Sequence, residues 1–405
     1  MIMNPSSNKT LEKRYLVPFI LVSSLFLLWG LANSMTDTLI AAFKNVMQMS
    51  DIQSSLIVFA FYGSYFCFAL PAALFIRKFS YKAGVLLGLG TYAAGAMMFY
   101  PAAQIATYGF YLIAIYVLAG GCAILETTAN PYILSMGAPE TATRRLNIAQ
   151  SLNPVGSVTG IVLSQTFILS NITLDSISGT YMVLGFVLVA VLIAMIFAKM
   201  PLGKDGDNAE GLLKSTRESF GRLMKNKKYV YGVITQFFYV GAQTGVWSYI
   251  IRIMMKEMGM VESSAANFYL ASIICFCVAR WLFTWLMAYV KPAKLMLFAA
   301  AADIVLCAVV VMGAGTGWIL ATALVLISFF MSLQFPTIYG IALGGVGDDA
   351  KIGASGLIMA ILGGALITPL QGQISDMFGI NIAYLVPLVC FIVVLAYSVY
   401  SVKER

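Results

Sequence analysis

Apolar runs long enough to cross a lipid bilayer recur along the whole chain. About 18 to 20 apolar residues in a helix span the ~30 Å hydrocarbon layer, and a helix satisfies its own backbone hydrogen bonds within lipid. Only 10% of the 405 residues are charged, whereas soluble domains carry about 25%. We therefore predict an all-α membrane protein with twelve transmembrane helices, at residues 15–45, 53–76, 83–101, 107–137, 142–170, 180–199, 229–255, 262–290, 293–313, 315–345, 350–375 and 380–401.

Basic residues mark alternate loops between these runs. The intervening loops carry only Lys44, Arg252 and Lys256. Because positively charged loops stay on the cytoplasmic side, we expect both chain ends to be cytoplasmic. The net charge of +8 is then a topology signal, and we expect no nucleic-acid partner. The basic loops and ends contain Lys9, Lys13, Arg14, Arg77, Lys78, Lys82, Arg144, Arg145, Lys291, Lys294, Lys351, Lys403 and Arg405.

One polar segment, residues 201–228, divides the runs into two sets of six. We predict a cytoplasmic linker here, with a short amphipathic helix near 211–225. The two sets resemble each other, since "TANPYILSMG" aligns with "QFPTIYGIALG" and pairs Pro131 with Pro336. Duplicated halves predict two pseudo-symmetric six-helix bundles, residues 1–200 and 229–405, with a binding site between them near the middle of the membrane.

Four ionisable residues stand out in the middle of apolar runs, namely Asp37, Glu126, Arg280 and Asp303. Each costs about 2.5–3.5 kcal/mol on insertion scales, so such residues are functional candidates by default. The chain has no histidine, and burial favours the neutral form of a carboxyl group. We therefore expect Glu126 and Asp37 to couple transport to protons. Depth along the helices favours Glu126 as the coupling acid, and which of the two carries the proton stays open.

Neutral amides share helix faces with these acids. Asn33 precedes Asp37 by four residues, and Asn130 follows Glu126 by four. Amides can simply join helices, but this set suits an uncharged, polyhydroxylated ligand because amides exchange hydrogen bonds with hydroxyls and an aromatic face covers C–H surface. Besides these four residues, the candidates for binding substrate are Gln150, Asn153, Gln236, Gln243, Trp247 and Gln334, and Gln371 adds a further amide.

The other two charged residues receive a different interpretation. Arg280 and Asp303 lie at similar depths on the two arms of one helical hairpin, so we predict a structural ion pair that neutralises both. A direct role of Arg280 in substrate binding or coupling is the alternative. The six cysteines lie in apolar runs without the spacing of a zinc site, so we expect no metal and no other cofactor. Pro131 is expected to interrupt its helix.

Several segments resemble the L-fucose:proton symporter family of the major facilitator superfamily. They are "WGLANSMTDTLI", "ILETTANPY", "RRLNIAQSLNPVGS", "QFFYVGAQTGVWSYIIR" and "SLQFPTIYGIALGGVG". The resemblance implies alternating access by two rocking bundles. It places the two functional carboxylates of the family on Asp37 and Glu126 and an amide on Asn153. It adds Phe335 as a substrate contact, where this branch of the family has a tyrosine.

The expected function is a proton-coupled symporter that imports a neutral monosaccharide, L-fucose or a related hexose. We expect a monomer in the bacterial inner membrane, with the proton, the sugar and the bilayer as partners. A proton-coupled antiporter that exports an amphipathic compound is the alternative. An enzyme is disfavoured because the sequence lacks a phosphate-binding loop and a nucleophile elbow. The identity of the sugar and the choice of H⁺ over Na⁺ stay open.

Overall fold

The computed structural model describes residues 10–11, 13–47, 51–169, 172–200, 209–313 and 317–404, and their regular structure is helical throughout. In the N-terminal half (residues 1–200) the elements are η1 (Lys13–Tyr15), α1 (Leu16–Val46), α2 (Asp51–Lys78), α3 (Tyr81–Met97), α4 (Phe99–Ile105), α5 (Tyr108–Ser135), η2 (Pro139–Thr141), α6 (Ala142–Gln150), α7 (Leu152–Ser164), the π-helical turn η3 (Gln165–Leu169) and α8 (Leu174–Phe197).

A separate helix, α9 (Ala209–Lys225), follows the first half. It lies within the predicted linker and confirms the short helix expected there. In the C-terminal half (residues 229–405) the elements are α10 (Lys227–Met258), α11 (Glu262–Leu286), α12 (Pro292–Met312), α13 (Trp318–Met331), α14 (Gln334–Ala342), η4 (Gly347–Asp349), α15 (Ala350–Met359), η5 (Ala360–Leu362), α16 (Gly363–Phe378), η6 (Ile382–Tyr384) and α17 (Leu385–Lys403).

Within the described residues, every predicted span falls largely on helix. Among the described residues, ten helical segments are long and apolar enough to cross a membrane. The remaining two predicted spans, 142–170 and 229–255, fall on α6, α7 and η3 and on the 32-residue helix α10. The predicted positions of the helices therefore agree with the structure. That twelve of them cross the membrane stays a prediction.

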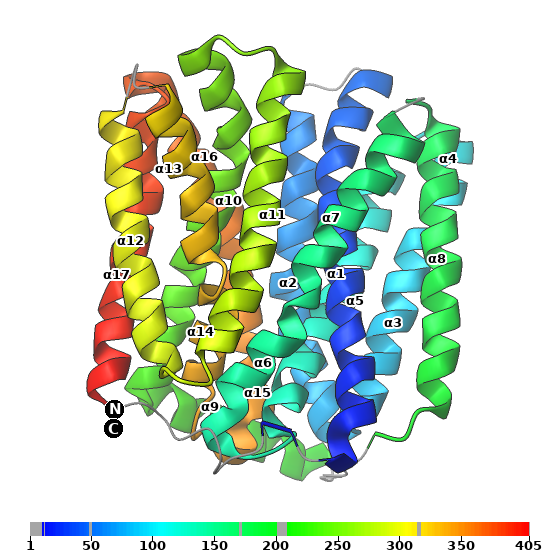
Figure 1. Cartoon of the computed structure of the whole chain (residues 1–405). Coiled ribbons are helices and arrows are strands. Elements are labelled where there is room, and N and C mark those ends of the chain that lie inside the picture. The colour runs from blue at the N-terminus through cyan, green and yellow to red at the C-terminus, as the bar shows by residue number, and fades with distance from the viewer. Residues whose placement is uncertain are drawn as a thin grey trace.

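The two halves stand side by side in Figure 1, with α1 to α8 on the right and α10 to α17 on the left. The beginning of η1 and the ends of α8 and α17 lie at the lower end of the molecule, where α9 also lies. This arrangement is the one expected from an even number of spans in each half, because such a half starts and finishes on one side of the membrane.

Small residues allow the helices of the N-terminal half to approach closely. A Cβ atom added to Gly121 of α5 would lie 2.3 Å from the backbone nitrogen of Tyr92 on α3, so only glycine fits there.

The interruption of α5 that was expected at Pro131 is not observed, because the helix continues through Pro131 to Ser135. A proline inside a membrane helix is tolerated when neighbouring groups and local adjustments compensate for the lost hydrogen bond.

Contacts between the halves join α14 to α6, and α15 to α2 and α5. Of these elements, α6, α14 and α15 lie towards the lower end of Figure 1, whereas α2 and α5 are long helices that extend well above it. Backbones approach closely here as well, since a Cβ atom on Gly340 of α14 would lie 3.0 Å from the Cα atom of Thr143 on α6. Nearby, the Asn147 side-chain amide donates to the Thr337 hydroxyl at 3.3 Å. The halves are therefore closed against each other at the end that carries α9.

Helix α9 adds a polar connection across the same end. The Arg222 guanidinium donates to both carboxylate oxygens of Asp349, at 2.8 and 2.7 Å, and so binds the beginning of α15. From the other half, Arg77 at the end of α2 donates to the hydroxyl of Ser219 at 2.8 Å and to that of Ser215. One amphipathic helix thus contacts both halves on the side where they meet.

Candidate functional site

A cavity of about 630 Å³ lies between the two halves. Its walls combine amides with aromatic rings, a composition that suits a small polar ligand with some apolar surface. Most of the predicted substrate-binding side chains line it. The N-terminal half contributes Asn33, Gln150 and Asn153, and the C-terminal half contributes Gln243, Trp247 and Phe335.

The cavity forms where helices are interrupted. Gln150 is the last residue of α6 and Asn153 lies in the first turn of α7, on either side of the break at Ser151. On the facing half, Phe335 follows the break between α13 and α14, and Ile361 lies in the short turn η5 between α15 and α16. Interrupted membrane helices are tolerated where they line a cavity, and they direct side chains and backbone groups towards a ligand.

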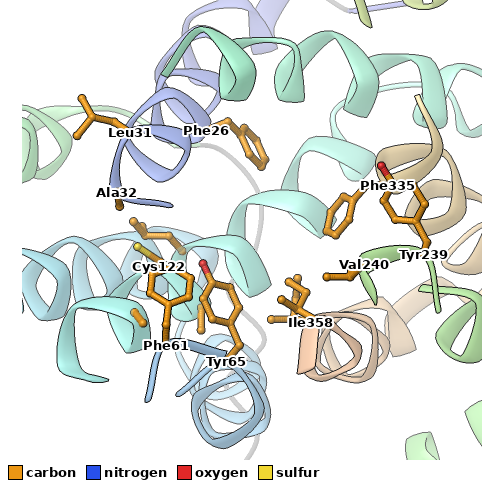
Figure 2. Close-up of a cluster of buried hydrophobic side chains, with 14 of the residues drawn as sticks. Phe26, Leu31, Ala32, Phe61, Tyr65, Cys122, Tyr239, Val240, Phe335 and Ile358 are labelled. Atoms are coloured by element: carbon orange, nitrogen blue, oxygen red, sulfur yellow. The ribbon is translucent and has the colours of Figure 1, made fainter. Parts of the chain in front are cut away.

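Aromatic rings on both sides of the cavity complete the wall. Trp247 packs edge-on against Phe276, with ring centroids 5.2 Å apart, and its indole nitrogen donates to the Ser328 hydroxyl at 3.1 Å. Figure 2 shows Phe335 beside Tyr239 in the C-terminal half, and Phe61 beside Tyr65 in the N-terminal half. The ligand space is therefore enclosed by rings that are themselves held by neighbouring side chains.

The sequence reasoning missed Trp29, Tyr62, Tyr65 and Tyr269, all of which line the cavity. Trp29 carried a usable signal, because it precedes Asn33 by one helical turn and so shares its face. Its indole N–H donates to the Tyr65 hydroxyl of α2. The tyrosines carried no such signal, because aromatic residues on helix faces occur throughout this chain.

Glu126 lies behind the cavity wall. It is 3% exposed and neither carboxylate oxygen has a hydrogen-bond partner among the described residues. The Asn130 amide faces it without meeting hydrogen-bond geometry. The Asn130 oxygen accepts a hydrogen bond of 2.8 Å from the side chain of Gln150, which lines the cavity. Two amides joined by a hydrogen bond therefore lie between the ligand space and the buried acid.

The remaining predicted residues are placed as follows. Asp37 lies in α1 one turn after Asn33, and its side chain is outside the described part of the structure. Gln236 is fully buried away from the cavity lining, and its amide has no partner in the described part of the chain. Gln371 is buried in the same way. Gln334 is also buried, and it contacts Asp303 rather than the cavity.

The predicted ion pair between Arg280 and Asp303 is wrong, since the two form no such contact in the structure. The Asp303 carboxylate accepts a hydrogen bond of 2.5 Å from the Gln334 amide. The reason is the order of the helices: α13 packs against both α11 and α12, which carry the two charges. Although α11 and α12 follow each other in the sequence, α13 packs against both of them. Similar depth in the membrane therefore did not bring the side chains of Arg280 and Asp303 together.

Arg280 instead lines the cavity. Its guanidinium lies over the Phe276 ring, 4.9 Å from the centroid, and one terminal nitrogen donates to the backbone oxygen of Gln150 at 3.4 Å. Its Nε has no partner among the described residues. The side chain is 3% exposed. It therefore reaches from the C-terminal half to the N-terminal half in the wall of the cavity.

The comparisons with known proteins agree with this architecture. The model of the Major Facilitator Superfamily matches residues 19–361. An L-fucose-proton symporter of Haemophilus influenzae is 42% identical, over 96% of this chain and 97% of its own length. The chain belongs to the L-fucose:proton symporter family of the Major Facilitator Superfamily. It is therefore a multi-pass membrane protein of a transporter family.

The chain is also similar to a solved structure and to a relative that is named for other sugars. A crystal structure of the superfamily transporter FucP in the outward conformation superposes with a TM-score of 0.88, at 34% identity over 96% of this chain and 99% of that one. A glucose/galactose transporter of Brucella abortus is 33% identical, over 99% of this chain and 98% of the relative. The fold expected from the sequence is thereby confirmed.

Proposed function

We propose that this protein is a proton-coupled symporter that imports a neutral monosaccharide, L-fucose or a related hexose. The observation that carries the proposal is the cavity between the halves, lined by amides and aromatic rings, with the hydrogen-bonded pair Gln150 and Asn130 between it and the buried acid Glu126. The names of the relatives, an L-fucose-proton symporter and a glucose/galactose transporter, support the same reading over export of an amphipathic compound.

In this proposal the sugar lies between Trp247 and the amides of the N-terminal half. The ring hydroxyls exchange hydrogen bonds with Asn33, Gln150, Asn153 and Gln243, because amides both donate and accept. The aromatic faces cover the C–H surface of the sugar. Arg280 donates to hydroxyls that face the C-terminal half.

Proton coupling rests on Glu126. A carboxylate charge without a hydrogen-bond partner is costly in a buried site, so the empty outward-facing protein holds Glu126 in its neutral form. Sugar binding closes the cavity, and opening to the cytoplasm hydrates Glu126 and releases its proton. Asp37, one turn from Asn33, serves the outer part of the pathway. We propose that the same cycle uses H⁺ rather than Na⁺.

The transport cycle follows from the two halves. We propose that residues 1–200 and 229–405 form the two rocking bundles, that 201–228 is their cytoplasmic linker, and that both chain ends are cytoplasmic in a bacterial inner membrane. In this proposal the end that carries α9 is the cytoplasmic end, and the contacts between the halves at that end support an outward-facing state. The likeness to FucP in the outward conformation supports this assignment. Each half-cycle needs one cavity and one copy of the chain, so we propose a monomer.

Reconstituted proteoliposomes test the coupling role of Glu126. We expect Glu126→Gln to abolish sugar accumulation driven by a proton gradient, while exchange of internal for external sugar continues. Glu140→Gln, which removes an exposed carboxylate from a turn, is the control and should accumulate sugar like the wild type. Accumulation by Glu126→Gln at the wild-type level would contradict the assignment.

The substrate is tested separately by binding calorimetry of the purified protein. L-Fucose, D-arabinose, galactose, glucose and N-acetylglucosamine form a suitable panel, each measured at two pH values. Binding of one or more sugars that weakens at the higher pH is expected, because deprotonation of Glu126 removes the neutral form that favours the sugar-bound state. If no sugar of the panel binds and a lipophilic cation does, the exporter becomes the better proposal.

A further inference from the structure

Asp303 is an acid for which the proposed transport cycle has no use. It lies in the middle of α12, is fully buried, and does not line the cavity. One carboxylate oxygen accepts the hydrogen bond from Gln334, and the other has no partner within the described residues. A buried acid with one neutral amide as its partner needs an explanation.

The partner of Asp303 stands at a structurally sensitive place. Gln334 is the first residue of α14, directly after the break that follows α13, and its amide also donates to the Phe330 carbonyl at 3.4 Å. The next residue, Phe335, lines the cavity. A displacement of Gln334 would therefore move the first turn of α14 and, with it, the Phe335 ring in the cavity wall.

A second contact holds the other side of this break. The hydroxyl of Tyr239 on α10 donates to the backbone oxygen of Met331, the last residue of α13, at 2.8 Å. The Tyr239 and Phe335 rings lie 6.3 Å apart. Asp303 on α12 and Tyr239 on α10 thus both bind residues beside the break between α13 and α14. The Phe335 ring, which lies next to this break, forms part of the cavity wall.

The surroundings of Asp303 favour an uncharged carboxyl group. The titratable side chains near it include Tyr239 on α10 and Cys307 on α12, and Arg280 on α11 donates to the backbone oxygen of Gln150 instead of to Asp303. An unpaired charge in such a place is strongly disfavoured. A neutral acid can also both donate to and accept from an amide, whereas a carboxylate only accepts.

We propose that Asp303 is a positioning residue which, as a neutral carboxylic acid, holds Gln334 and thereby sets Phe335 against the bound sugar. It does not carry the coupled proton. The inference rests on the proposed function only for the identity of the ligand. The structural part of the inference, that Asp303 holds the first residue of α14 in place, applies to any ligand of this cavity.

Two substitutions separate the positioning role from a role in proton coupling. Asp303→Asn replaces a neutral acid by a neutral amide of the same shape, and we expect accumulation, pH profile and KM to stay within about twofold of the wild type. Asp303→Ala removes the contact, and we expect KM to rise about tenfold with little change in the pH profile. Cys307→Ala, one turn further along α12 and also buried, is the matched control and should leave KM unchanged.

The opposite pattern would overturn the proposal. If Asp303→Asn loses accumulation but keeps exchange, as expected for Glu126→Gln, Asp303 carries a proton. If Asp303→Ala keeps the wild-type KM, Asp303 does not position the wall. Should Asp303→Ala fail to fold, Gln334→Ala removes the same contact from the other side and is expected to give the same rise in KM.

Hydrogen–deuterium exchange provides a readout that needs no substrate. We expect the amides of residues 332–337 to exchange faster in Asp303→Ala and at the wild-type rate in Asp303→Asn. Unchanged exchange in Asp303→Ala would refute the positioning role even if no sugar binds. Absence of sugar binding by the wild type, with faster exchange in Asp303→Ala, would instead refute the proposed substrate and leave the positioning role supported.

Discussion

Unsatisfied hydrogen-bonding groups at Glu126 and Arg280 give the site its chemical character. Most buried polar groups in folded proteins have partners, yet both Glu126 oxygens and the Arg280 Nε have none among the described residues. Such groups cost stability in the empty protein and regain it when a ligand or a proton arrives. Arg280 lines the cavity and Glu126 lies behind its wall, so these groups can exchange hydrogen bonds with a ligand or take up a proton there.

The geometry of Arg280 leads to a prediction at this scale. Arg280→Lys keeps the positive charge but loses the planar guanidinium that spans from Phe276 to Gln150. We expect KM for the sugar to rise about tenfold, equivalent to about 1.4 kcal/mol of binding, while proton dependence is retained. Transport kinetics in proteoliposomes provide the measurement. Arg217→Lys on the exposed face of α9 is the control, and an unchanged KM in Arg280→Lys would remove Arg280 from the ligand contacts.

Individual helices are fitted to one another through small residues, so their packing tolerates little added volume. α5 carries Glu126 and passes α3 so closely at Gly121 that a methyl group would meet the backbone of Tyr92. In lipid, helix association depends on such close packing because the hydrophobic effect between helices is absent. The depth and rotation of Glu126 therefore depend on a residue that does not line the cavity.

We expect Gly121→Ala to destabilise the protein by about 1–3 kcal/mol, because the two backbones must separate to admit the methyl group. Thermal unfolding in detergent should show a lower Tm than the wild type. Gly90→Ala on α3 is the matched control, since nothing lies within 4 Å of a Cβ atom at Gly90. Equal Tm values for the two variants would show that the α3–α5 contact is not tightly packed.

The whole molecule closes at one end, through direct contact of the halves and through α9. Direct contact includes the α6–α14 approach at Gly340 and the position of Lys351 over the Tyr81 ring, 5.2 Å from its centroid. Helix α9 adds the ion pair between Arg222 and Asp349. These contacts must break when the cavity opens towards α9, so they set the balance between the two states of the carrier.

Loss of the Arg222 contact is therefore expected to shift the population towards the state open at the α9 end. Spin labels at the exposed positions of Lys78 and Lys291, in a variant without native cysteines, report the distance between the halves. We expect longer distances to gain population in Arg222→Asp and the wild-type distribution to return when Asp349→Arg is added. An unchanged distribution in Arg222→Asp would mean that α9 does not contribute to closure.

Much of this architecture was accessible from the sequence, because hydropathy, charge and helical periodicity are local properties. The predicted spans all fall on helices, and the amides predicted from shared helix faces, such as Asn33 and Gln150, line the cavity. Glu126 and Asn130 lie on one face of α5 as their spacing required. These features follow from 18-residue apolar stretches and a 3.6-residue period, which need no knowledge of neighbours.

The tertiary structure decided which helices pack against each other, and therefore which polar groups meet. α13 packs against both α11 and α12, so Arg280 faces the cavity and Asp303 pairs with Gln334 instead of with Arg280. It also placed Gln236 behind the cavity wall although Gln243 and Trp247 of the same helix line it. Periodicity states which residues share a face, but which neighbour covers each part of that face depends on contacts between segments distant in the chain.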